Sequence, residues 1–533
     1  MTSSVASALK ERTESAQETQ EETTVMTARR PGRRAVMVSA VLTQLMIVLD
    51  LTIIAIALPR MQDDLGMTVS QSPWTVTGYS LAFGGLVLFG GRLCAVVGIR
   101  RSYQVGLIGF GVASLAAGMA TSFPILLVAR VAQGCFGALL APTSQSLLNV
   151  TFTERTERER VFAIFGATGG LGAAVGLLVG GALTDWISWR WALYINILLA
   201  TAALLIGQRS LPPADQRDRG SRITDDLTGL VLGCGACFSA VYGLDRAQQT
   251  SWTSTSTVSW LALGGIAAVL FVVRERFANR PVLPLSMMAL PVRAASYATQ
   301  FIAGAGQMGA IIYLTYYMQN HFGYSPFKSG VVFLPMVLSL IATAIPAGRV
   351  IVPRLGARGT LPLGLAVLTG SFLIFSRMTT QSSYSQVALP GLIVFGIGLG
   401  LTMPVTFNSG TRGVDAKRTG LASAILSAAQ QIGGSFGVAL MTSYATQHAE
   451  DYVAEHSEEV RAAAMEAMMR AQALPQSPAG KQIIEALKAQ LVDRAQIEAY
   501  AGGFTMMAWI LAGAGAALVA CGITLSVRRR RTR

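Results

Sequence analysis

One acidic and one basic residue lie inside long apolar stretches, where charged side chains are rare. Asp50 is the one acid among 28 Asp and Glu residues that we place well inside the hydrocarbon, and Arg130 is the corresponding cation. A carboxylate there must pair, face water or take up a proton. A guanidinium stays charged and can bind a nearby carboxylate or carbonyl group. Both residues predict proton coupling; an ion pair that only joins two helices is the structural alternative.

Glycine recurs at every fourth position in the apolar stretch after Arg160. Gly172, Gly176 and Gly180, with Gly181 beside the last, place a stripe without side chains on one helix face. Two helix backbones can approach closely over such a stripe. The spacing predicts tight packing against a neighbouring helix, and whether the stripe also seals a pathway stays open.

Aromatic and amide side chains recur near the ends of several apolar stretches. Aromatic residues at such positions either anchor a membrane protein at the interface or line a cavity for an amphipathic or aromatic ligand. Both interpretations are equally supported at this point. The candidate cavity residues are Trp74, Tyr79, Gln133, Asn196, Tyr313, Tyr316, Tyr317, Gln319 and Gln431.

The residue clusters that enzymes use do not stand out in this sequence. The three histidines fall between apolar stretches, and Cys234 and Cys237 form a C-x-x-C pair without a second pair of metal ligands. The sequence contains no G-x-x-x-x-G-K-[ST] motif for binding ATP. We therefore expect no enzyme activity, no metal and no cofactor, with a proton gradient as the energy source.

The elements that position these residues are membrane helices. Hydrophobic residues make up 52% of the 533 positions and charged residues 13%, whereas soluble proteins carry about 25% charged residues. Fourteen stretches approach the roughly 20 residues that a helix needs to cross the hydrocarbon layer, and they do not alternate like barrel strands. The expected spans are residues 36–59, 73–91, 102–121, 124–149, 161–183, 188–207, 226–244, 257–273, 294–318, 329–348, 360–376, 386–408, 419–446 and 503–526.

The net charge of +14 is distributed periodically along the chain. Basic residues gather in every second connection, as at Arg155, Arg158 and Arg160, whereas the opposite short connections hold at most one each. By the positive-inside rule, both termini are cytoplasmic and the number of spans is even. Arginine far outnumbers lysine, as in GC-rich bacterial genomes. We expect a multi-pass protein of the bacterial plasma membrane that has no nucleic-acid partner.

Two segments of the chain share a pattern of glycine and arginine. Gly98 and Arg100 follow Gly91-Arg92, and Gly356 and Arg358 follow Gly348-Arg349, with internal spacings that differ by one residue. Such similarity suggests duplicated halves. We expect a disordered tail (1–34), two helix bundles separated at a cytoplasmic linker (208–225), and a basic cytoplasmic tail (527–533).

A polar insert at 448–501 precedes the last apolar stretch, on the extracellular side. Its parts 450–470 and 480–500 place apolar residues at helical spacing against charged residues, so we expect short surface helices. A loop without a function of its own and a segment that binds a partner or acts as a lid are about equally supported.

Several motifs along the chain match the pattern of one known family. The first extends from Leu49-Asp50-Leu51-Thr52 to Ala57-Leu58-Pro59. Further matches cover nearly the whole chain in order: Trp74-Thr75-Val76-Thr77-Gly78-Tyr79, Arg130-Val131-Ala132-Gln133-Gly134, Trp189-Arg190-Trp191, Ile195-Asn196, Gly323-Tyr324-Ser325-Pro326, Leu334-Pro335, Gly420-Leu421-Ala422-Ser423 and Gln431-Ile432-Gly433-Gly434. In these motifs the sequence resembles the fourteen-helix drug/proton antiporters of the major facilitator superfamily.

The resemblance implies a six-helix bundle (35–207), two inserted helices (226–280) and a second six-helix bundle (281–526), with alternating access around a central cavity. It implies that Asp50 and Arg130 take part in proton coupling and that Gly172, Gly176, Gly180 and Gly181 belong to an antiporter motif. It also implies a conformational-switch loop that contains Gly91, Arg92, Gly98, Arg100 and Arg101.

Two positions depart from the family pattern. Ala95 stands where the switch loop usually carries Asp, which puts the conformational balance in doubt. Leu177 replaces a usual Pro, which predicts a straighter helix. Neither change removes Asp50 or Arg130.

The sequence therefore favours a monomeric, proton-coupled antiporter that exports hydrophobic or amphipathic small molecules, such as drugs, antibiotics or a natural product of the host. A facilitator or importer on the same fold is the first alternative, because fold does not decide direction. A membrane sensor that binds ligands without transporting them is the second alternative. A membrane enzyme is the weakest alternative.

Overall fold

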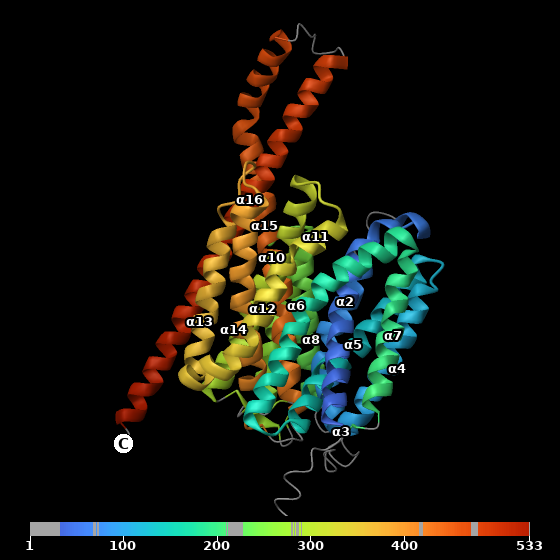
Figure 1. Cartoon of the computed structure of the whole chain (residues 1–533), viewed down its shortest axis with the longest axis vertical. Helices are drawn as coiled ribbons and strands as arrows, with labels where there is room; N and C mark the ends of the chain where they lie inside the picture. Colours follow the sequence, from blue (N-terminus) through green and yellow to red (C-terminus); the bar gives the residue numbers. More distant parts are fainter. Residues whose placement is uncertain are drawn as a thin grey trace, which may run out of the picture.

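Helices account for all the regular secondary structure in the described part of the chain (Figure 1). The computed structural model describes residues 32–67, 71, 74–208, 210–211, 227–278, 281, 283, 287–288, 290–414, 419–470 and 478–531. The predicted tail thus lies outside the described residues as far as residue 31, and so does most of the predicted linker 208–225.

The helices fall into two groups and an intervening pair. The N-terminal group contains α2 (Arg33–Leu65), α3 (Trp74–Val97), α4 (Ile99–Gly118), α5 (Phe123–Thr151), α6 (Arg155–Trp186) and α7 (Trp189–Gly207). The pair consists of α8 (Leu227–Gln249) and α9 (Thr255–Phe277). The C-terminal group contains α10 (Pro291–Tyr316), η3 (Tyr317–His321), α11 (Pro326–Val332), α12 (Leu334–Pro346), η4 (Ala347–Ile351), α13 (Val352–Phe375), η5 (Tyr384–Ala388), α14 (Leu389–Thr411), α15 (Thr419–Arg470) and α16 (Pro478–Arg531).

Local sequence signals explain where many of these helices begin. Ser188, Ser254 and Ser325 each accept a hydrogen bond from a backbone N–H of the first turn that follows, and Ser383 forms a capping box with Gln386. A single glycine, Gly98, separates α3 from α4. Its φ of 97° is accessible to glycine and costly for other residues, so this position breaks the helix sharply.

Each of the fourteen predicted spans coincides with a described helix or helical run. Ten described segments are long and apolar enough to cross a membrane, and one of them, Phe327–Phe375, extends over 49 residues and can cross more than once. The three remaining predicted spans, 102–121, 161–183 and 294–318, coincide with α4, α6 and α10. The positions therefore agree, and the exact count of fourteen crossings is consistent with the structure.

Within each group, helices contact both their neighbours in the chain and helices further along the chain. In the N-terminal group α2 packs against α6 and α7, α3 against α5, and α4 against α5 and α7. In the C-terminal group α10 packs against α15, and α14 against α12 and α13. The pair α8 and α9 joins both groups because α8 contacts α3 and α15. The predicted domain limits stay predictions.

The last two long helices extend well beyond the bundle. Figure 1 shows α15 and α16 rising side by side from one end, which we call the hairpin end; α2 begins and α16 finishes at the opposite, terminal end. The prediction of short surface helices for 448–501 is wrong, because its described parts, residues 448–470 and 478–501, continue the two long helices α15 and α16. The physical reason lies in the sequence: residues 438–470 and 481–501 contain neither glycine nor proline, so nothing local ends either helix.

Candidate functional site

Asp50 and Arg130 form an ion pair in the interior of the N-terminal group. Arg130 Nη1 lies 2.6 Å from Asp50 Oδ2, and both side chains are shielded from solvent, with exposed fractions of 0% for Arg130 and 1% for Asp50. The two residues were singled out separately in the sequence, and the structure brings them into direct contact. An ion pair in such a dry place is stable only when its remaining hydrogen-bonding groups are also satisfied.

Two amides complete the surroundings of the Asp50 carboxylate. Asn196 Nδ2 donates to Asp50 Oδ1 at 2.6 Å, and Gln133 Nε2 donates to the same oxygen at 3.1 Å. Both carboxylate oxygens therefore accept hydrogen bonds from uncharged or cationic N–H groups. An ionised carboxylate accepts and never donates, so this arrangement fits the deprotonated form.

Arg130 contacts three further groups besides Asp50. Its Nε donates to the Thr75 carbonyl at 3.1 Å, and its Nη1 also donates to Gln133 Oε1 at 2.9 Å. The guanidinium carbon lies 4.6 Å from the centre of the Tyr79 ring, which is the geometry of a cation–π contact. Arg130 thus has partners that remain in place whatever the protonation state of Asp50.

Five helices supply this cluster, which we call the Asp50 network: Asp50 on α2, Thr75 and Tyr79 on α3, Ser114 on α4, Arg130 and Gln133 on α5, and Asn196 on α7. Arg130 and Gln133 face the same way because they are three residues apart on one helix. Gly134 permits the close approach of α5 to α3, since a Cβ there would collide with the Tyr79 carbonyl. Ser114 and the Thr75 carbonyl carry no signal in the sequence that marks them as members of this network.

The glycine stripe of α6 packs against the turn of α2 that carries Asp50. A Cβ at Gly172 would lie 3.1 Å from Val48, one at Gly176 would overlap Thr52, and one at Gly180 would lie 3.1 Å from Ile53 Cα. The predicted close packing is therefore present, and its partner is the Asp50 helix. Gly181 is buried next to the stripe, and the helix continues through Leu177 without interruption.

The predicted switch loop is the end of one helix and the start of the next. Gly91 and Arg92 are buried in the last turns of α3, Gly98 is the break, and Arg101 is exposed on α4. Arg100 Nη2 donates to the Gln208 carbonyl at the end of α7, at 3.3 Å. The contact joins α4 to α7, and the switching role of this segment stays a prediction.

The nine candidate cavity residues lie in several different parts of the protein. Tyr79, Gln133 and Asn196 belong to the Asp50 network. Trp74 contacts Tyr242 of α8, and Gln431 of α15 lies beside Gly84 of α3. The others belong to the hairpin end of the C-terminal group: Tyr313 donates to Thr442, buried Tyr317 donates to the Thr379 carbonyl, Tyr316 is exposed and Gln319 is half-buried. The structure therefore does not gather all nine around one point.

Two further acids, Asp245 and Glu275, lie near the ends of α8 and α9. Asp245 is inside the candidate span Leu227–Ala247 and accepts a hydrogen bond from Thr77 Oγ1 at 3.1 Å. Glu275, in the span Thr255–Phe277, accepts from the Leu283 N–H at 2.9 Å. Both residues fall just past the predicted span ends, because hydropathy defines such ends only to within a few residues. Each stands among the last three residues of its segment, so the expectation that Asp50 alone lies well inside the hydrocarbon stays a prediction.

The two groups meet across the terminal end of the bundle. Arg158 Nε donates to Asn408 Oδ1 at 2.9 Å, and Thr411 Oγ1 donates to Asn149 Oδ1 at 3.1 Å. Beside these contacts the ring of Phe407 on α14 packs against Phe162 and Phe165 on α6, with centroid distances of 6.4 and 6.0 Å. Polar and aromatic contacts therefore hold α5 and α6 against α14 at this end.

Comparison with known proteins identifies the family. The profile of the Major Facilitator Superfamily matches residues 40–438, about three quarters of the chain. This protein belongs to the major facilitator superfamily. It is therefore a multi-pass membrane transporter of all-α architecture, as the sequence predicted.

The similar proteins include antibiotic resistance and export proteins. The puromycin resistance protein of Streptomyces alboniger is 40% identical over 416 residues, which cover 78% of this chain and 82% of that protein. The cephamycin export protein of Amycolatopsis lactamdurans is 33% identical, covering 76% and 83%. A structure of the proton:xylose symporter XylE superposes with a TM-score of 0.56 at 12% identity, over 92% of this chain and 96% of that one, and shows the shared fold.

Proposed function

We propose that this transporter exports hydrophobic or amphipathic small molecules, antibiotics among them, across the bacterial plasma membrane in exchange for protons. The observation that carries the proposal is the Asp50–Arg130 ion pair, which places a titratable carboxyl group in the dry interior of the N-terminal group. The names of the two antibiotic relatives support the substrate class and the direction of transport. Proton exchange at Asp50 would supply the driving force, without a bound cofactor.

The first step of the proposed cycle is proton uptake by Asp50. A proton on the carboxylate removes its attraction to Arg130 and turns one acceptor oxygen into a donor. Arg130 would then keep the Thr75 carbonyl, Gln133 Oε1 and the Tyr79 ring as partners. The contacts of Asp50 with α5 and α7 would weaken, because the N–H groups of Arg130, Gln133 and Asn196 all require an acceptor.

The second step carries this change to the junction of the two groups. The turn around Asp50 packs on the glycine stripe of α6, and the same helix contacts α14 through Phe162 and Phe165. A shift of α2 against α6 would therefore change the contacts between α6 and α14. Opening the terminal end requires these aromatic contacts and the Arg158–Asn408 hydrogen bond to separate.

The orientation in the membrane follows from the arginine-rich connections. The junctions between α3 and α4 and between α5 and α6, which carry Arg100 and Arg158, lie at the terminal end, so we place this end and both chain termini in the cytoplasm and the hairpin end outside. Because contacts between the groups hold the terminal end together, we infer that the described conformation is closed to the cytoplasm. We expect the transporter to act as a monomer.

The experiment is transport into inside-out vesicles energised by a pH gradient, with puromycin as the first compound and a panel of dyes and antibiotics beside it. Asp50→Asn keeps the size of the side chain and removes its proton exchange. Asp63→Asn is the matched control, because Asp63 is an exposed acid on the same helix. We expect wild type and Asp63→Asn to accumulate substrate when the gradient is present, and Asp50→Asn to match empty vesicles.

Other outcomes would favour the alternatives. Flux that is independent of the pH gradient and equal in Asp50→Asn would identify a facilitator. Binding without flux under any gradient would identify a membrane sensor and refute the transport cycle proposed here.

A further inference from the structure

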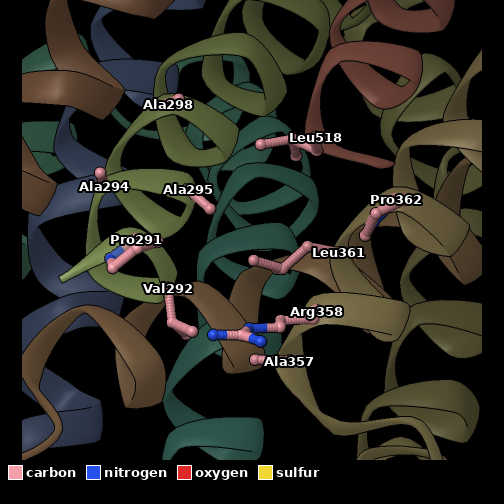
Figure 2. A pocket seen from close by; sticks show the side chains of 10 residues that line it. All are labelled: Pro291, Val292, Ala294, Ala295, Ala298, Ala357, Arg358, Leu361, Pro362 and Leu518. Carbon is pink, nitrogen blue, oxygen red and sulfur yellow. The ribbon is translucent and has the colours of Figure 1, made fainter. Parts of the chain in front are cut away.

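An apolar pocket of about 270 Å³ opens at the terminal end of the C-terminal group. Figure 2 shows it between the first turns of α10, the first turns of α13 and the late part of α16. Its walls are almost entirely aliphatic, and one charged residue, Arg358, stands among them. The side chains used below are Val292, Ala295, Ala298, Arg358, Leu361 and Leu518.

Arg358 is a cation without a partner in the described part of the chain. Its side chain is exposed, and no hydrogen bond or ion pair joins it to another described group. The guanidinium reaches across the pocket opening toward Val292 (Figure 2). The turn at Gly356, with a φ of 64°, sets the direction of the following residues and places Arg358 at this opening. A positive charge thus borders a hole with apolar walls.

The internal repeat shows how the equivalent position in the N-terminal group is filled. Gly98 and Arg100 correspond to Gly356 and Arg358, and both glycines have positive φ values, of 97° and 64°. Three residues after each arginine comes Tyr103 in one group and Leu361 in the other. Arg100 has a partner, since its Nη2 donates to the Gln208 carbonyl.

Tyr103 closes the N-terminal counterpart of the pocket. It is fully buried, and its hydroxyl group hydrogen-bonds to Ser39 Oγ at 2.8 Å and Thr43 Oγ1 at 2.6 Å on α2. Ser39 in turn donates to the Ala203 carbonyl on α7 at 2.7 Å. In the C-terminal group, Leu361 and the alanines of α10 leave the corresponding space between α10, α13 and α16 open. Tyr103 thus fills the space between α2, α4 and α7, whereas the corresponding space between α10, α13 and α16 is a pocket.

The surroundings of the pocket face the lipid. Next to its lining, Leu355, Leu363 and Val519 have exposed fractions of 52%, 40% and 45%, as expected for side chains that contact acyl chains in a membrane. The volume lies below the roughly 300–1,000 Å³ typical of pockets for whole drug-sized ligands. It suits part of a long apolar chain that continues out into the bilayer.

We propose that this pocket binds one acyl chain of an anionic phospholipid whose phosphate pairs with Arg358. An arginine guanidinium binds phosphate oxygens in pairs, and basic pockets between membrane helices favour anionic headgroups. The lipid would belong to the leaflet at the terminal end. It would tie α10, α13 and α16 together where Tyr103 and its hydroxyl partners tie α2, α4 and α7. This proposal does not depend on the transport cycle above.

The test is native mass spectrometry of the purified full chain, titrated with an equimolar mixture of phosphatidylglycerol and phosphatidylcholine. We expect wild type to retain one phosphatidylglycerol preferentially. Arg358→Gln should weaken this binding by about tenfold, because a charge-assisted contact is lost. Arg354→Gln is the matched control, since Arg354 is exposed one turn earlier on α13 but does not line the pocket.

A second variant tests the pocket itself. Leu361→Tyr introduces the residue found at the repeat position and should reduce retention of the lipid by occupying the space of its chain. Thermal unfolding and gel filtration of each variant identify those that have misfolded, and Arg358→Lys provides a folded variant that keeps the charge and should retain the preference for phosphatidylglycerol.

Three results would overturn the proposal. Equal retention of both lipids by wild type would remove the role of the headgroup. Wild-type binding by both Arg358→Gln and Leu361→Tyr would place the lipid elsewhere. Displacement of phosphatidylglycerol by equimolar oleate would show that a single-chain acid, not a phospholipid, is the preferred occupant.

Discussion

Thr52 of α2 lies directly against Gly176 of α6, two residues beyond the buried Asp50. The contact is too close for any side chain at position 176, and it joins the two features that the sequence displayed separately, a buried acid and a glycine stripe. The helix that carries the carboxylate and the helix that contacts the other group are therefore packed backbone to backbone at the Asp50 turn.

Gly176→Ala should destabilise the protein by about 1–3 kcal/mol, because its Cβ would overlap Thr52 and force α2 and α6 apart. Thermal unfolding of the purified protein measures this effect, and transport should fall with it. Gly169→Ala is the control on the same helix: nothing lies within 4 Å of the added Cβ, so we expect a gain of up to about 1 kcal/mol from helix propensity. Equal effects of both changes would contradict the close packing.

Arg130→Ala should cost about 3–5 kcal/mol of stability, because it leaves the Asp50 carboxylate buried without its cation. The double variant Asp50→Asn with Arg130→Gln should recover a large part of that loss, since neither charge remains. A double-mutant cycle of unfolding free energies measures the coupling. Strictly additive losses would show that the two side chains do not stabilise each other.

Cross-linking at the terminal end should stop transport. Asn149 and Thr411 face each other from α5 and α14 across the junction of the two groups. We expect Asn149→Cys with Thr411→Cys, in a background that lacks the five native cysteines, to lose transport on treatment with a short bis-methanethiosulfonate, which reacts with one thiol at each end. Each single cysteine variant should remain active under the same treatment. Full activity of the cross-linked protein would mean that the junction need not open.

The ion pair between Asp64 and Arg190, at the hairpin end, should make the stability of the protein depend on pH. Hydrogen bonds from Arg190, and also from Trp189, hold the pKa of the Asp64 carboxyl below its ordinary value of 3.8. A carboxyl with a lowered folded pKa stabilises the protein at pH values above its unfolded pKa, and this contribution is lost as the pH falls through the folded value. Asp64→Asn should therefore lower Tm at neutral pH and leave it unchanged in strong acid.

Thermal unfolding of wild type and Asp64→Asn over this pH range checks the prediction. The effect should be small because about half of the Asp64 side chain is exposed to water. Asp63→Asn, which changes an exposed neighbouring acid, should shift Tm little at any pH. A difference between wild type and Asp64→Asn that persists in strong acid would rule out the titration of Asp64 as its cause.

The membrane class, the positions of the helices and the identity of the conspicuous buried charges can be predicted from the sequence alone. These properties are local: a run of about 20 apolar residues must form a helix in hydrocarbon because each backbone group needs a partner within the segment. Asp50 and Arg130 stood out for the same reason, as charges that such a run tolerates only with compensation. The repeat of Gly98-x-Arg100 and Gly356-x-Arg358 was likewise visible before the fold.

The groups that compensate those charges are known only once the helices are packed. Asp50 pairs with Arg130 across 80 positions and also receives Asn196 from α7, which no pattern within α2 specifies. The partner of the glycine stripe, and the vacancy beside Leu361 where Tyr103 fills the other repeat, likewise depend on how whole helices pack. Hydropathy and periodicity say which face of a helix needs a neighbour, but the identity of that neighbour follows from the complementary shapes and polar groups of segments far apart in the chain.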